Sequence, residues 1–216
     1  VSDAAILTTD PLNAITVFHD AQRHEVRVAR ETQRLLADHV HQLPPALGDT
    51  LEARAALFAV LAWKQRVSST LTTMHNLGVL GWLLPEFGRL RWQTQRDMYH
   101  FFTVDEHSLR GIVELERLRD GAYKADHPLL TQVIREIDKI EFLFLSMLYH
   151  DVGKGHGHDH DERGAAMTLA TAARWQLPPD ETQEWHFLVQ HHLHMSSIAQ
   201  RKDLSDETVI AEGKDS

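Results

Sequence analysis

The chain has 216 residues, 43% of them hydrophobic, which is enough for a folded core in one large domain or two small ones. It contains no cysteine, so disulfides and thiolate metal sites are excluded, and His, Asp and Glu remain as the strong metal ligands. The formal net charge of -9 argues against a broad nucleic-acid-binding face, because phosphate backbones are held by dense Lys and Arg. No run approaches the roughly 20 apolar residues of a membrane span and no signal pattern opens the chain, so we expect a cytoplasmic protein without a membrane partner.

The first part of the chain has the pattern of helices joined by short breaks. Asp10-Pro11 is typical of a helix start, with a capping carboxylate and a proline in the first turn. Apolar residues at helical spacing, Val26 among them, continue through two adjoining segments up to His41. The proline- and glycine-containing stretch 43–48 then interrupts the pattern.

A second group of helices is predicted after this break. Thr50 is expected to cap the first of them, and Ser68 or Ser69 the next. The apolar face of the helix after Thr50 is expected to consist of Leu51, Ala55, Phe58 and Leu61. Three glycines and a proline within 74–88 indicate short helical pieces packed tightly at a turn.

Polar residues that could carry chemistry become denser after Gln95 and lead into a helix expected over 104–118, ended by Gly121. One stripe of this helix, at spacings of three and four, comprises Val104, His107, Gly111, Leu115 and Leu118. The stripe places His107 on the inward face. A lone inward histidine is more often a satisfied core residue than a ligand, but this one points toward the region where the next apolar helix must also pack.

The most apolar run of the chain, residues 140–148, is followed directly by His150-Asp151. This pattern predicts a buried helix that delivers both side chains at its end. A His-Asp pair is usually a cap or a surface hydrogen bond, yet imidazole and carboxylate side by side also suit a divalent metal. Half of the 16 histidines lie between His150 and His194, which favours the metal. Lys154 adds a positive charge beside the pair, as a phosphate oxygen would require.

Two more helices are expected over 161–175 and 181–192. The second has a stripe formed by Trp185, Leu188, Val189 and His192. One of the paired histidines, His191 and His192, should therefore face inward and the other lie at the edge. Two solvated histidines near a helix C-terminus are an equal alternative. Further along, two carboxylates could each be a helix cap or a metal ligand: Asp203 and Asp206.

Three of these features form a series along the chain: a histidine inside a helix, a His-Asp pair some forty residues later and an aspartate some fifty residues beyond it. The series resembles the HD superfamily of metal-dependent phosphohydrolases, which has an all-helical fold. Longer phrases resemble the central HD domain of the bifunctional PII uridylyltransferase/uridylyl-removing enzyme family. These phrases are 77–81, 84–88, 99–107, 150–155 and 191–196, followed by 201–203. The similar positions run from about Pro11 to about Asp206, nearly the whole chain.

The resemblance implies an all-α protein: an HD-domain helical bundle at 96–216 with a helical N-terminal extension, 1–95, packed on it. It further implies a domain excised from a larger enzyme, because no nucleotidyltransferase motif and no glutamine-sensing ACT domain is recognisable here. We therefore expect any hydrolysis by this chain to be insensitive to glutamine.

The implied activity is hydrolysis of the phosphodiester that joins UMP to a tyrosine of the PII nitrogen-signalling protein. The resemblance implies that one divalent ion (Mn, Mg, Fe or Zn) is bound by His107, His150, Asp151 and Asp203. Spare ligands for a second ion are His160, His191 and His192. Lys154 and His100 would neutralise charge on the phosphate oxygens.

Two histidines do not fit this family assignment, and two alternative functions remain open. His156 and His158 depart from the family's loop pattern, and we interpret them as solvated loop residues rather than ligands. Another HD-type nucleotide phosphohydrolase would use the same ligands. A catalytically silent HD sensor or docking module is the alternative from a different class, although a pure scaffold has no physical need for the ligand set.

Overall fold

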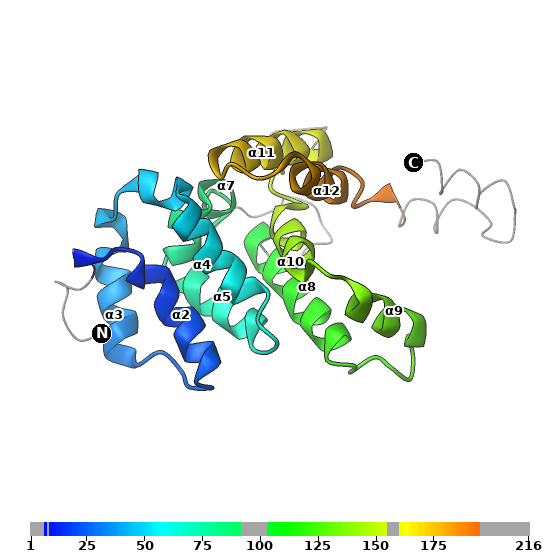
Figure 1. Cartoon of the computed structure of the whole chain (residues 1–216), viewed down its shortest axis with the longest axis horizontal. Coiled ribbons are helices and arrows are strands. Elements are labelled where there is room, and N and C mark those ends of the chain that lie inside the picture. The colour runs from blue at the N-terminus through cyan, green and yellow to red at the C-terminus, as the bar shows by residue number, and fades with distance from the viewer. Residues whose placement is uncertain (1–6, 8, 92–102, 155–159, 195–216) are drawn as a thin grey trace, which may run out of the picture.

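The computed structural model describes residue 7 and residues 9–91, 103–154 and 160–194, and in this part of the chain the regular elements are helices, with no strand. The predicted all-α class is therefore confirmed. Figure 1 shows the helices between residues 13 and 76 grouped together, the helices at 104–119 and 140–149 next to them, and the pair at 160–190 lying across one end of this group.

The N-terminal helices follow the predicted breaks. They are α2 (Asn13–Arg23), α3 (Arg30–His39), η1 (Val40–Gln42), η2 (Pro45–Asp49), α4 (Leu51–Leu61), α5 (Val67–Asn76), α6 (Val79–Leu83) and α7 (Pro85–Gly88). Just before α2, where the sequence predicted a helix start, the Asp10 carboxylate accepts a hydrogen bond from the Leu12 amide at 3.2 Å. Val26 lies between α2 and α3 and is 54% exposed, so its expected place on a helical apolar face is wrong.

The start of α4 confirms one prediction and corrects another. The Thr50 hydroxyl accepts from the Ala53 amide at 3.2 Å, as expected of an N-cap. The buried face, however, consists of Ala53, Leu57, Val60 and Leu61. Leu51, expected on that face, is 43% exposed. Apolar residues occur all round this helix, so periodicity alone does not single out a face, and packing against α2 and α10 decides it.

The expected serine cap of α5 is wrong. The carboxylate of Glu116, on α8, accepts hydrogen bonds from the backbone N–H of Val67 at 2.7 Å and of Ser68 at 3.0 Å. It also accepts from the Ser68 hydroxyl. A side chain 48 residues away therefore satisfies the first amides of α5.

The second half of the chain supplies α8 (Val104–Arg119), α9 (Pro128–Val133), η3 (Ile134–Glu136), α10 (Ile140–Tyr149), α11 (His160–Arg174) and α12 (Pro179–Gln190). These bounds confirm the four helices expected there to within two residues. The run that forms α10 is buried as predicted, with Phe144, Leu145 and Leu148 fully inaccessible. One hydrophobic cluster joins these side chains to those of α2, α4 and α5. The two proposed parts of the chain thus share a core, and their division at residue 95 stays a prediction.

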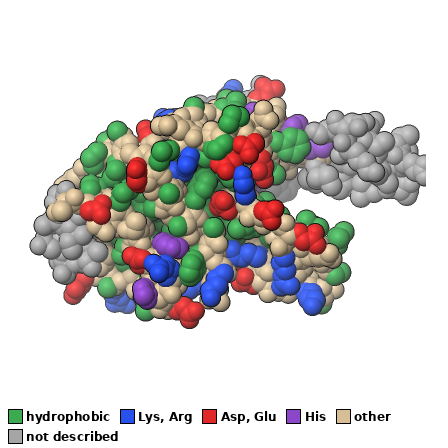
Figure 2. Space-filling model, in the orientation of Figure 1, with side chains coloured by type: hydrophobic (Ala, Val, Ile, Leu, Met, Phe, Trp, Pro, Cys, Tyr) green, Lys and Arg blue, Asp and Glu red, His purple; other side chains and the backbone are tan. Residues whose placement is uncertain are grey.

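The surface combines both signs of charge. On the visible face, basic side chains lie over α8 and α9 with acidic side chains among them (Figure 2). Among the described residues, no helix combines the length and apolar character that a bilayer crossing requires.

Candidate metal centre

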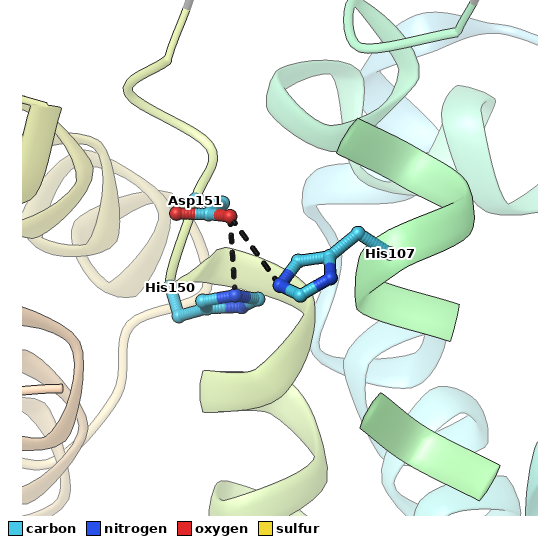
Figure 3. A group of neighbouring side chains, drawn as sticks. All are labelled: His107, His150 and Asp151. Carbon is cyan, nitrogen blue, oxygen red and sulfur yellow. Dashed lines mark ion pairs between the residues drawn. The ribbon is translucent and has the colours of Figure 1, made fainter. Parts of the chain in front are cut away.

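Four helices bring their ends together around one carboxylate. His107 lies in the first turn of α8, and His150 and Asp151 follow directly on α10. Figure 3 shows the rings of His107 and His150 on the same side of the Asp151 carboxylate, approaching from two different helices. His160 is the first residue of α11, and His192 comes just after α12. The residues are therefore far apart in sequence and adjacent in space.

One oxygen of Asp151 faces two imidazoles and an ammonium group. Its Oδ2 lies 3.7 Å from Nε2 of His107 and 3.3 Å from Nε2 of His150. Lys154 Nζ donates to the same oxygen at 2.6 Å. The donor atoms of His107, His150 and Asp151 all lie within 4.8 Å of one another, a spacing that one ion could bridge after small side-chain movements.

The other oxygen of Asp151 faces a second pair of imidazoles. Oδ1 lies 4.0 Å from Nε2 of His160 and 4.0 Å from Nε2 of His192. The donor atoms of Asp151, His160 and His192 again lie within 4.8 Å of one another. A carboxylate shared by two donor groups is the arrangement expected of a bridging ligand in a two-ion site.

The backbone determines which nitrogen of two rings faces the centre. Nδ1 of His150 lies 2.8 Å from the carbonyl oxygen of Met147, and Nδ1 of His192 lies 2.7 Å from that of Val189. A carbonyl oxygen only accepts, so each Nδ1 carries the proton. In the neutral rings the Nε2 lone pairs then point toward Asp151, which is the orientation of metal-binding histidines.

The buried groups of the centre fit a cation. Nε2 of His192 is buried and has no hydrogen-bond partner among the described residues. Burial lowers the pKa of His192 below its ordinary value, which keeps the ring neutral and its lone pair available. Burial opposes ionisation of Asp151, but a proton on the His150 side facing it, together with Lys154, outweighs burial and lowers the pKa of this carboxyl well below its usual range, and a bound cation would take the place of that proton. Nitrogen and carboxylate donors of this kind suit manganese, magnesium, iron or zinc.

Two glycines allow the close helix contacts on which the centre depends. A Cβ at Gly111, one turn after His107, would overlap the side chain of Met147 on α10. A Cβ at Gly153 would overlap the carbonyl oxygen of His160, at the start of α11. Each glycine lies within one turn of a histidine of the cluster or of its contact residue. The absence of a side chain at these two positions therefore lets the helices bring the histidines together.

The structure separates the predicted site residues into three groups. It brings together His107, His150, Asp151, Lys154, His160 and His192. It leaves His191 outside both donor groups, where its ring lies 4.6 Å from that of Phe187. The remaining candidates fall outside the described residues: His100, His156, His158, Asp203 and Asp206.

The expected inward stripe of α8 needs correction. The buried residues of this helix are Val104, Asp105, Ser108, Leu109, Ile112 and Glu116. The His107 side chain is 49% exposed. The buried stripe is offset because α8 packs against both α5 and α10, and His107 lies at the edge of that packing, where it meets His150.

Sequence reasoning missed a buried polar group behind the centre. Glu86 is 8% exposed and contacts Tyr149 and Arg174. The available signal was a single carboxylate between Leu84-Pro85 and Phe87 in an apolar stretch, since an isolated charge there needs a buried partner. That partner lies 88 residues away and is not visible in the local pattern.

Comparisons with known proteins give a consistent similarity. Residues 1–83 match the family model described as "Uridylyltransferase GlnD third domain". The chain is 39% identical to the Bifunctional uridylyltransferase/uridylyl-removing enzyme of Azotobacter vinelandii over 212 residues, 97% of this chain and 24% of that protein. It is also 39% identical to the enzyme of the same name from Pseudomonas aeruginosa over 191 residues, 88% of this chain and 21% of that protein. The chain thus spans between a fifth and a quarter of the length of these relatives, and almost all of it is similar to one segment of them.

Proposed function

We propose that this chain is a metal-dependent phosphodiester hydrolase that removes UMP from a uridylylated tyrosine of the PII signalling protein. The observation that supports this most strongly is the Asp151 carboxylate with a pair of histidine Nε2 atoms facing each of its oxygens. The relatives' name contains two activities, and a cluster of imidazole and carboxylate donors suits the hydrolytic, uridylyl-removing one.

In this proposal each residue of the cluster has a defined task. His107, His150 and Asp151 would hold one divalent ion. The family resemblance adds Asp203, which lies outside the described residues, as a further ligand. His160 and His192, together with Asp151, would hold a second ion. Metal binding would supply hydroxide as the nucleophile at neutral pH, because it lowers the pKa of coordinated water from about 15.7 toward about 7.

A positively charged side chain beside the cluster can neutralise the negative charge of the substrate's phosphate group. Lys154 contacts Asp151 through a side chain that is 21% exposed, so its ammonium group lies at the rim of the cluster. There it can neutralise the non-bridging phosphate oxygens as negative charge moves toward the leaving group. His100 is proposed for the same task. The leaving group is a tyrosine phenolate of pKa about 10, which needs less protonation than an alkoxide would.

The experiment that tests this function is release of UMP from uridylylated PII by the purified chain, with each divalent metal in turn. The Asp151→Asn variant removes the shared carboxylate, and His191→Gln is the matched control because His191 lies outside both donor groups. We expect metal-dependent release by the parent and by His191→Gln, and none by Asp151→Asn.

Other outcomes would contradict the proposal in distinguishable ways. Release of product from a panel of nucleotides, but not from uridylylated PII, would indicate another nucleotide phosphohydrolase. Binding of PII without hydrolysis of any substrate would indicate a docking module.

A further inference from the structure

A buried carboxylate links α10 and α11, two of the four helices whose ends meet at the metal centre. Glu86, on α7, is 8% exposed and accepts hydrogen bonds from both α10 and α11. Burial opposes its ionisation, but the hydrogen bonds and charge of Arg174, a backbone hydrogen bond and the hydrogen bond from Tyr149 together outweigh burial and lower the pKa of Glu86. Glu86 therefore stays negatively charged and able to accept several hydrogen bonds at once.

The link to α10 passes through its last residue. The hydroxyl of Tyr149 donates to Oε2 of Glu86 at 3.2 Å and lies 3.2 Å from Oγ1 of Thr171 on α11. His150 and Asp151 are the next two residues, so the anchored Tyr149 ring determines where the last turn of α10 presents them.

Glu86 is linked to α11 through Arg174, at the opposite end of that helix from His160. Arg174 donates to Oε1 of Glu86 at 2.5 Å and to Oε2 at 3.2 Å, a two-pronged contact. Its Nε also donates to Asp49 at 2.9 Å. Since α11 runs from His160 to Arg174, a fixed Arg174 restrains how far this helix can slide or rotate.

The two helices also touch directly beside the ligands. A Cβ placed on Gly164 would lie 3.4 Å from the carbonyl oxygen of Tyr149, so the backbones of α10 and α11 run close together at this point. The distance from Asp151 Oδ1 to His160 Nε2, 4.0 Å, spans this same interface. A small shift of one helix against the other would change that distance and separate the donor atoms.

We propose that Glu86 is a positioning residue for the metal centre: by holding Tyr149 and Arg174 together it sets the placement of α10 against α11, and hence of Asp151 against His160. This proposal rests on the proposed function. Glu86 acts through its two partners, because the cluster of donor atoms consists of other residues.

A comparable buried carboxylate provides the control. Glu116 is also 8% exposed and also accepts several hydrogen bonds, but its partners are Val67 and Ser68 at the start of α5 and Arg119 on its own helix. It lies on α8, nine residues beyond His107. Glu86→Gln and Glu116→Gln thus make the same chemical change in equally buried groups, and both should lower the melting temperature.

The first readout is the affinity for manganese, measured by titration calorimetry on the folded variants. Partners that orient metal ligands typically contribute about 10- to 100-fold in affinity. We expect Glu86→Gln to raise the dissociation constant by about tenfold or more, Tyr149→Phe to change it in the same direction, and Glu116→Gln to leave it at the parent value. Parental affinity in Glu86→Gln, at a loss of melting temperature like that of Glu116→Gln, would overturn the proposal and leave Glu86 a purely structural ion pair.

The second readout needs no metal and separates this proposal from the proposed function. The ring nitrogen resonances of His150 and His160 are compared by NMR in the metal-free chain. We expect them to shift in Glu86→Gln and to stay in place in Glu116→Gln. A parent chain that binds no manganese would contradict the metal centre, whereas unchanged ring resonances in Glu86→Gln would overturn the positioning role whether or not the parent binds metal.

Discussion

The Nδ1 atom of His150 lies 2.8 Å from the carbonyl oxygen of Met147, so the neutral ring has its proton on the backbone side and its lone pair on the Asp151 side. Nε2 of His150 and Oδ2 of Asp151, 3.3 Å apart, are then both acceptors. Two acceptors at this distance repel unless a proton or a metal cation lies near both. A divalent ion resolves this repulsion while leaving the ring neutral.

The first prediction concerns metal stoichiometry. The two donor groups share only Asp151, so we expect two manganese ions per parent chain at saturation, one in His192→Gln and none in Asp151→Asn. His191→Gln should keep the parental content, because His191 belongs to neither group. Elemental analysis after dialysis measures all four proteins. Equal metal content in Asp151→Asn and the parent would exclude the proposed centre.

The second prediction separates charge stabilisation from metal binding at Lys154. Lys154→Ala removes the ammonium group 2.6 Å from Asp151 without removing a proposed ligand. We expect unchanged metal content and a fall in kcat of roughly 100-fold, since one group that stabilises transition-state charge contributes about this much. Steady-state release of UMP from uridylylated PII provides the measurement. If turnover stays at the parental rate, Lys154 only neutralises Asp151.

The third prediction concerns the close contact at Gly153. An added Cβ would overlap a backbone atom, the carbonyl oxygen of His160, which cannot move without shifting α11. We expect Gly153→Ala to lower the free energy of unfolding by about 1–3 kcal/mol, as overpacking typically does. Gly48→Ala is the control, because its Cβ would meet atoms of Leu83 and Trp82 at 3.6–3.7 Å, an ordinary contact. Urea unfolding curves of both variants measure the difference, and equal losses would contradict the overlap.

The fourth prediction concerns acid stability. The pKa of Glu86 is lowered in the folded protein, because burial raises it but the hydrogen bonds and charge of Arg174, with a backbone hydrogen bond and that from Tyr149, together lower it by more. A carboxyl group with a lowered folded-state pKa contributes stability that is present above its unfolded pKa, about 4.3, and is lost as the pH falls through the folded pKa. The stability difference between parent and Glu86→Gln should therefore be constant from about pH 7 to about pH 5 and shrink below about pH 4. Unfolding curves at each pH measure it, and a difference that persists unchanged in acid would contradict the charge state of Glu86.

The helical class and the centre of the site could be predicted because their signals are local. The dense apolar run 140–148 ends at His150-Asp151 in one continuous stretch, and α10 delivers both side chains as that pattern indicates. The spacing of α8 likewise indicated that His107 would meet this pair, although the buried stripe of the helix is offset.

The parts that sequence reasoning missed depend on contacts between distant residues. Glu116 caps α5 from 48 residues away, and Glu86 pairs with Arg174 across 88 residues. The choice between His191 and His192 likewise depends on which ring the end of α12 turns toward Asp151. Periodicity locates a residue on its own helix but contains no information on which other helix will supply its partner.

The measurement that tests the central claim most directly is anomalous X-ray diffraction from crystals of this chain grown with zinc. If Asp151 is a metal ligand, the anomalous map should show a peak about 2.1 Å from Nε2 of His107 and of His150 and at a similar distance from Oδ2 of Asp151. A second peak between His160, His192 and Oδ1 would establish the two-ion arrangement. A map without a peak within bonding distance of either Asp151 oxygen, from crystals that contain zinc elsewhere, would contradict the metal centre.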